Sequence, residues 1–139
     1  MTNTTLLKDL QHLIETNLDA SLFPYQKGNS IRIGKIVVRD SKKGFLIYDC
    51  QENKQVAITF SKTAALALAK SLAKGHNNTN TVMQLDQTIQ KNYMDALFFT
   101  NTIKTTNDEF KKDVTLTRLE IAKARTANAK SALDSIIFR

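Results

Sequence analysis

Lysine and arginine crowd into the middle third of this 139-residue chain. The stretch Lys27–Lys74 nets +7, which equals the formal charge of the whole chain, whereas Met1–Gln26 nets −2 and Gly75–Arg139 nets +2. A localised positive field attracts phosphates and acidic surfaces and accelerates encounter with them. The pattern therefore predicts binding of a polyanion, and nucleic acid is the partner that we expect.

Residue types that perform catalysis are sparse and isolated. The sequence holds two histidines and one cysteine, Cys50, and it lacks a phosphate-binding glycine loop, a zincin helix, a nucleophile elbow and a paired-cysteine zinc motif. The acids Asp108, Glu109 and Asp113 are placed to complement the dipole of a helix start rather than to hold a metal. We expect a non-enzymatic protein with no catalytic residues, metal or cofactor.

The overall composition is that of a folded domain. Hydrophobic residues make up 42% and charged residues 24% of the chain, which argues against general disorder. The start of the chain does not read as an export signal, and no apolar run reaches the roughly 20 residues that a membrane span needs. A lone cysteine suits a reducing compartment. We expect a cytoplasmic protein without a membrane partner.

Breaker residues divide the chain into two parts. The single proline and all four glycines lie at or before Gly75, so a turn-rich part precedes a helical one. We expect an α+β protein with a basic module over residues 1–75, a polar linker over 76–81 and a helical hairpin over 82–139.

The first part is expected to be an α-β-β-β-α module with a three-stranded antiparallel sheet. Helical spacing of leucine and isoleucine predicts a helix over 5–18, and Ser61 caps a second helix over 62–74. Alternation predicts strands over 31–39, 45–49 and 55–60. In one regular strand, Ile31 and Ile33 would face one side and Ile36 and Val38 the other. We therefore expect a β-bulge at Gly34-Lys35, which would return all four to the same face.

This register gives the sheet a basic outer face. The residues expected to bind nucleic acid lie on that face, in the adjoining turn and at the start of the second helix: Arg32, Lys35, Arg39, Lys42, Lys43, Lys62 and Tyr48. Tyr48 would offer a base-stacking surface of the kind that single-strand binders use. The alternative is that these cations only solvate the wet face of an antiparallel sheet.

The last third is expected to fold as a helical hairpin bent near 104–107. A capping box at Thr106-Asn107-Asp108-Glu109 favours this bend over one uninterrupted helix. The expected apolar stripes are Val82, Leu85, Ile89, Tyr93, Ala96, Leu97 and Ile103 on the first helix, and Phe110, Val114, Ile121, Ala124 and Ile136 on the second.

Surplus apolar residues on these helices give the alternative function. We expect an oligomeric structural or assembly protein in that case, with an interface formed by Phe98, Phe99, Phe110, Ile136, Ile137 and Phe138. Neighbours such as Phe98 and Phe99 cannot both face one seam at 100° per residue. Either the basic module covers the surplus groups, or a second copy or another protein does.

The order of elements resembles the double-stranded RNA-binding domain over about 5–74. The likeness lies in Ser61-Lys62-Thr63-Ala64-Ala65 with Ala67 and Ala69, where that family opens its last helix with a Ser-Lys-Lys element and continues in alanines. The resemblance implies that Lys62 contacts phosphate. The sequence has only Lys62 where the family has a basic cluster.

A second resemblance is to small uncharacterised proteins of marine, cyanophage-type tailed phages. It rests on the segment over 48–57 (YDCQENKQVA) leading into that over 60–65 (FSKTAA), and on a composition rich in Asn, Lys, Thr and Ile. It implies a phage origin, hence a place in the host cytoplasm or the virion, and no activity.

Overall fold

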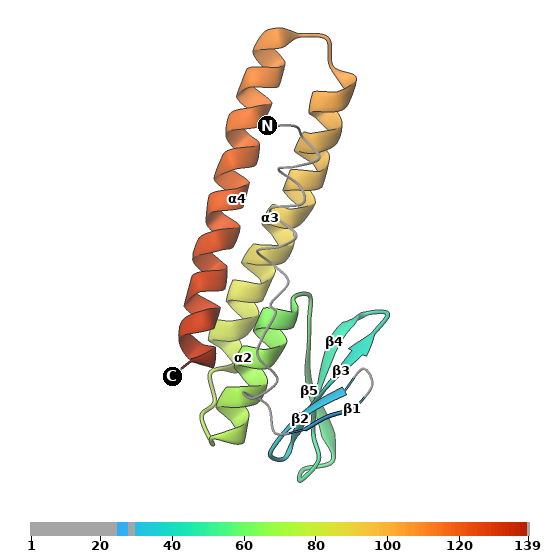
Figure 1. The fold of residues 1–139 in the computed structure, drawn as a ribbon, viewed down its shortest axis with the longest axis vertical. Coiled ribbons are helices and arrows are strands. Elements are labelled where there is room, and N and C mark those ends of the chain that lie inside the picture. The colour runs from blue at the N-terminus through green and yellow to red at the C-terminus, as the bar shows by residue number, and fades with distance from the viewer. Residues whose placement is uncertain (1–24, 28–29, 139) are drawn as a thin grey trace.

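The computed structural model describes residues 25–27 and 30–138. These residues form an antiparallel sheet followed by three helices, the last two packed as a hairpin (Figure 1). The strands are β1 (Tyr25–Lys27), β2 (Ser30–Ile33), β3 (Ile36–Ser41), β4 (Gly44–Asp49) and β5 (Lys54–Thr59). The helices are α2 (Lys62–Ala73), α3 (Thr79–Thr105) and α4 (Glu109–Ile137). The α+β class is confirmed, and the helix expected over 5–18 lies outside the described residues.

The sheet has five strands in the order β1-β2-β3-β4-β5, and the expected three-stranded sheet is wrong. The stretch expected to be one bulged strand is a hairpin, in which Ile33 pairs with Ile36 around the two-residue turn Gly34-Lys35. Gly34 has a φ of +57°, as the first residue of a tight hairpin turn often requires. Because Ile31 pairs with Val38 and Ile33 with Ile36, all four side chains project to the same face of the sheet. The turn therefore explains the change from odd to even apolar positions that suggested a bulge.

Helix α2 covers one face of this sheet. Ile31, Ile36, Val38 and Ile47 project from that inner face and are buried together with the alanines and leucines of α2. Small alanine side chains let the helix lie close to the strands. Figure 1 shows α2 between the sheet and the helical hairpin, so this helix contacts both layers.

Both ends of α2 carry the capping groups that its sequence predicts. The Ser61 Oγ accepts a hydrogen bond from the Ala64 amide at 3.2 Å, as an N-cap residue does. At the other end Gly75 has a φ of +85°, its amide bonds to the Leu72 carbonyl, and the His76 amide bonds to the Ser71 carbonyl. This pair of bonds is a Schellman motif.

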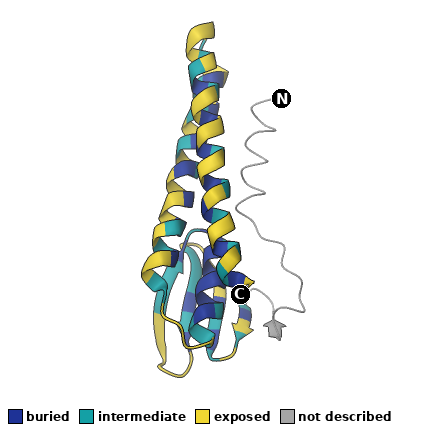
Figure 2. Cartoon of the chain, turned by 90° about the vertical axis from the view of Figure 1, so that its left-hand side faces the viewer, coloured by how far each residue is buried: buried dark blue, intermediate teal, exposed yellow. Residues whose placement is uncertain are grey.

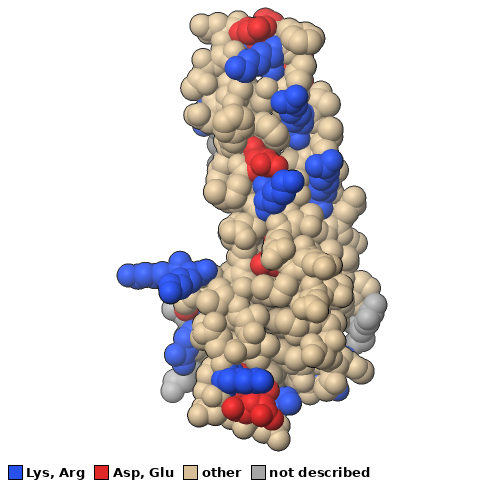
Figure 3. All heavy atoms as spheres, turned by 180° about the vertical axis from the view of Figure 1, so that it is seen from behind, with Lys and Arg blue, Asp and Glu red and all other residues tan. Residues whose placement is uncertain are grey.

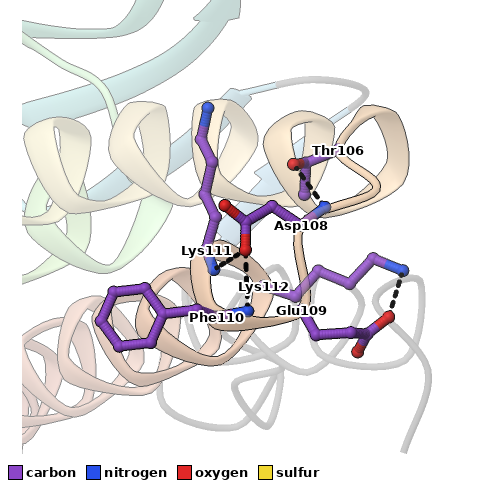
Figure 4. Close-up of polar contacts among 6 residues, drawn as sticks. All are labelled: Thr106, Asp108, Glu109, Phe110, Lys111 and Lys112. Atoms are coloured by element: carbon purple, nitrogen blue, oxygen red, sulfur yellow. Dashed lines mark hydrogen bonds and ion pairs between the residues drawn. The ribbon is translucent and has the colours of Figure 1, made fainter.

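Helices α3 and α4 lie antiparallel and extend beyond the sheet (Figure 1), which confirms the hairpin over the single long helix. The N-cap of α4 is Asp108 rather than the expected Thr106. The Asp108 carboxylate accepts from the amides of Phe110 and Lys111, and the Thr106 Oγ accepts from the Asp108 amide (Figure 4). A carboxylate at this position also complements the positive end of the helix dipole.

The seam of the hairpin contains many small or polar side chains. Buried residues recur at three- or four-residue spacing, as in coiled-coil helices, and they form dark stripes along the inside of the hairpin in Figure 2. They are Val82, Asp86, Ile89, Asn92, Ala96, Thr100 and Ile103 on α3, and Thr115, Leu119, Ala122, Thr126, Ala129, Leu133 and Ile137 on α4.

The stripe expected on the second helix is therefore wrong for Phe110, Ile121 and Ala124, which are exposed. Two threonines, which the expected stripe did not include, lie in the seam instead. Thr115 and Thr126 bury their hydroxyls by donating to the carbonyls of Lys111 and Ala122, four residues earlier.

One buried carboxylate joins the hairpin to the sheet layer. Asp86 on α3 is 3% exposed, and its oxygens accept hydrogen bonds from the Phe60 amide at 2.8 Å and from the Ser61 amide and hydroxyl at 2.9 Å. These donors form the junction between β5 and α2. The ring of Phe60 also packs on Tyr93 of α3, with 5.6 Å between ring centroids.

We expect Asp86→Asn to lower the free energy of unfolding by about 2–4 kcal/mol, because an amide group would face N–H donors in a buried site. Urea unfolding measures the change, with Asp95→Asn as the control because Asp95 lies on the same helix outside this junction. Equal stability of the two variants would contradict the role given to Asp86.

Candidate nucleic-acid interface

The strand register decides which side chains share the outer face of the sheet. Directly paired residues project to the same side. One row across the sheet holds Arg32, Val37, Tyr48 and Gln55, and the next holds Ser30, Arg39, Leu46 and Ile58. Arg32, Arg39 and Tyr48 thus lie on the outer face, as the sequence predicts, and none of these eight residues is acidic.

Both arginines of this face are exposed to solvent. The Arg32 Nε donates to the Gly34 carbonyl at 3.0 Å, which holds the guanidinium near the β2–β3 turn. Arg39 lies near the other end of the sheet, where it pairs with Leu46. Both arginines therefore lie next to Val37, and the half-buried side chains of Leu46 and Ile58 continue the row of Arg39 across β4 and β5.

Tyr48 lies on β4, beside the strand that carries Arg39, and it is half-buried. Its hydroxyl donates a short hydrogen bond to the side-chain oxygen of Asn53, in the turn before β5. Asn53 has a φ of +53°, which asparagine adopts more readily than most residues. The bond ties the hydroxyl end of the side chain to this turn, while the register of β4 places the side chain on the outer side of the sheet.

Lys35 is not part of the outer face, which corrects the expected site. It lies in the β2–β3 turn, and its ammonium group is 3.8 Å from the carboxylate of Asp49, which projects to the inner side. The same carboxylate accepts from the amides of Gln51 and Glu52 in the next turn. The bulge expected at Gly34-Lys35 would have turned Lys35 outward, but the hairpin turn does not.

Lys42, Lys43 and Lys62 lie at the opposite end of the sheet from Lys35. The two exposed lysines form the β3–β4 turn, which Gly44 brings against the backbone of Thr59. Lys62 is the first residue of α2, on the inner side of the sheet, and it is half-buried. The structure therefore joins Lys42 and Lys43 to the Arg39 end of the outer face and leaves Lys62 at its rim.

Positive charge is not confined to the sheet. Figure 3 shows lysine and arginine side chains over both the hairpin and the sheet end of the face opposite to that of Figure 1. The outer face is distinguished instead by two adjacent rows of eight described residues without a carboxylate, in which arginines on β2 and β3 lie beside an aromatic ring on β4.

The expected interface residues of the hairpin separate into two groups. Phe98, Phe110 and Phe138 are exposed, whereas Ile137 is fully buried within the core of the chain, and Phe99 and Ile136 pack partly against it. The ring of Phe138 lies 5.9 Å from the Lys70 ammonium, which also makes a short hydrogen bond to the Ile137 carbonyl. Burial lowers the pKa of Lys70 below its ordinary value, and the nearby Lys74 lowers it further.

Within the described ranges, no group of three His, Cys, Asp or Glu side chains is placed to hold a metal ion. None of the described helices is both long and apolar enough to cross a bilayer. Cys50 is exposed at the end of β4.

Comparison with known proteins gives no relative: the chain matches no protein-family model, no curated protein and no solved structure at a significant level. The function must therefore be inferred from the residues of the chain itself.

The two turn glycines that shape this face differ in what surrounds them. Gly34 has room for a Cβ, which would lie 3.6 Å from that of Ala73, whereas a Cβ on Gly44 would collide with the Thr59 carbonyl oxygen. We expect Gly34→Ala to cost about 1–2 kcal/mol for the dihedral alone. Gly44→Ala should cost more, because backbone atoms must also move. Melting temperatures rank the two variants, and a larger loss for Gly34→Ala would contradict these turn geometries.

Proposed function

We propose that this protein binds nucleic acid through the outer face of its sheet. The observation that carries the proposal is the strand register, in which Arg32, Arg39 and Tyr48 share one face and none of the eight described residues of their two rows is acidic. Arginine is suited to this role because its planar group donates to two phosphate oxygens at once. Lys42 and Lys43 extend the positive surface beyond the Arg39 end.

The face favours single strands over duplex. An exposed base can stack on an aromatic ring, and stacking of this kind contributes about 1–3 kcal/mol per base. Tyr48 provides the ring, and the neighbouring half-buried Leu46 and Ile58 provide apolar contact for a second base or a sugar. A flat sheet face does not enter the major groove of B-form DNA, whereas it can carry an extended strand.

The alternative role in assembly depends on the exposed apolar residues of the hairpin remaining uncovered in the isolated chain. The groove that holds Phe98 and Phe110 also contains two cations, Lys111 and Arg118. A second copy docked face to face would bring these like charges together, and their repulsion would oppose self-association. Assembly is therefore the alternative and nucleic-acid binding the first proposal.

The salt dependence of binding tests the proposal. If Arg32, Arg39, Lys42 and Lys43 each neutralise one phosphate, the log–log slope for a single-stranded oligonucleotide is about −3. We expect the double variant Arg32→Gln/Arg39→Gln to reduce that slope to about −1.5 and to weaken binding in 50 mM salt. Fluorescence anisotropy across a salt series measures both quantities.

The matched control removes the same charge from the hairpin. Lys104→Gln/Lys111→Gln changes two exposed cations near the hairpin turn and should leave the slope nearly unchanged. If the control loses affinity and the sheet variant does not, the hairpin is the binding surface and the proposal is wrong. Absence of binding by the parent chain at the lower salt also refutes it.

A further inference from the structure

The hairpin carries an apolar groove near its turn. Phe98 on α3 is 67% exposed and Phe110 on α4 is 77% exposed. With Phe99 and Val114 they line an open cavity of about 250 Å³. The Phe110 side chain points away from the capping contacts of its own turn (Figure 4), so those contacts do not account for its position.

The apolar wall of this groove continues along α4. Ile121 lies seven residues beyond Val114, on nearly the same side of the helix, and it is 45% exposed. Single exposed apolar side chains are common on protein surfaces, whereas a contiguous set that lines a groove marks a contact surface. A groove between two antiparallel helices is also the shape that a third helix fills, because its side chains pack between those of the first two.

The charged residues of the groove restrict its occupant. Among the eight described residues that line it, Lys111 and Arg118 alone are charged, and both are exposed. They lie seven residues apart on α4, which places them on one side of the helix about 10.5 Å from each other. Two carboxylates seven residues apart on a partner helix would face these cations.

The same pattern disfavours other occupants. A second copy of the groove would bring its own two cations against these. A nucleic-acid strand carries a charge at every nucleotide, whereas the α3 side of the groove, formed by Phe98, Phe99 and Thr102, is uncharged. We propose that the groove docks an amphipathic helix of another protein, with apolar side chains on one side and Asp or Glu at seven-residue spacing beside them.

A display library of amphipathic helical peptides tests the docking. The library fixes leucine at the a and d positions of about three heptads and randomises the flanking positions. The full-length protein should enrich peptides that carry Asp or Glu seven residues apart at a flanking position. These peptides should bind the Phe98→Ser/Phe110→Ser variant about tenfold more weakly. Because both rings are exposed, their loss removes contact surface without disturbing the seam.

Charge reversal tests the role of the two cations. In the Lys111→Glu/Arg118→Glu variant, an enriched acidic peptide should lose affinity about tenfold, whereas its counterpart with lysine in place of the acids should gain affinity. The matched control is Lys42→Glu/Lys43→Glu, which makes the same change of charge in the β3–β4 turn and should leave the preference for the acidic peptide unchanged. Fluorescence anisotropy with labelled peptides measures each affinity.

Several outcomes overturn the proposal. One is that no peptide is enriched, and another is that the enriched peptides lack acids or bind the Phe98→Ser/Phe110→Ser variant equally well. Displacement of the peptide by a single-stranded oligonucleotide whose binding needs Phe98 and Phe110 would make the groove a nucleic-acid site instead. Self-association that light scattering detects and the same variant abolishes would make a second copy the occupant. All groove substitutions lie on the hairpin, so the result is independent of nucleic-acid binding by the sheet.

Discussion

The arrangement of this protein depends on one buried carboxylate. Asp86 projects from α3 and accepts three hydrogen bonds from the junction of β5 with α2. These bonds replace the water that a carboxylate would otherwise need, and the negative charge lies beside the positive end of α2. As a result the hairpin packs on the helix side of the sheet, and the opposite face of the strands carries its own set of side chains.

The seam of the hairpin explains why aromatic residues lie outside it. Ala96, Ala122 and Ala129 bring α3 and α4 close together, and buried threonines satisfy their hydroxyls within their own helices. Small and polar side chains thus occupy about half of the seam positions. The larger apolar groups are therefore displaced to the sides of the hairpin, where they are available for another contact.

The sequence predicts the regular elements well because their signals are local. The caps of α2 at Ser61 and Gly75 and the strand over 45–49 depend on neighbouring residues, and the structure confirms them. The β2–β3 turn was missed because a bulge and a two-residue turn restore side-chain parity equally well. Only the pairing of Ile33 with Ile36 distinguishes them, and this is a property of the sheet rather than of the segment.

The same distinction applies to the candidate site. Arg32, Arg39 and Tyr48 could be assigned to one face because their parity within the strands is fixed. Lys35 could not, because its direction depends on the turn and on Asp49. The role of Asp86 had a signal, an acid at a helical position among buried apolar residues, but its partners Phe60 and Ser61 are known only once the layers are packed.

The central claim is that nucleic acid contacts the outer face of the sheet. Amide and arginine side-chain chemical shifts, followed by NMR during titration with a single-stranded oligonucleotide, test it most directly. The account predicts that the largest changes fall on Arg32, Arg39, Tyr48 and the turn at Lys42-Lys43, while α3 and α4 stay unchanged. Changes concentrated on the cations of the hairpin, with the sheet unaffected, would contradict it.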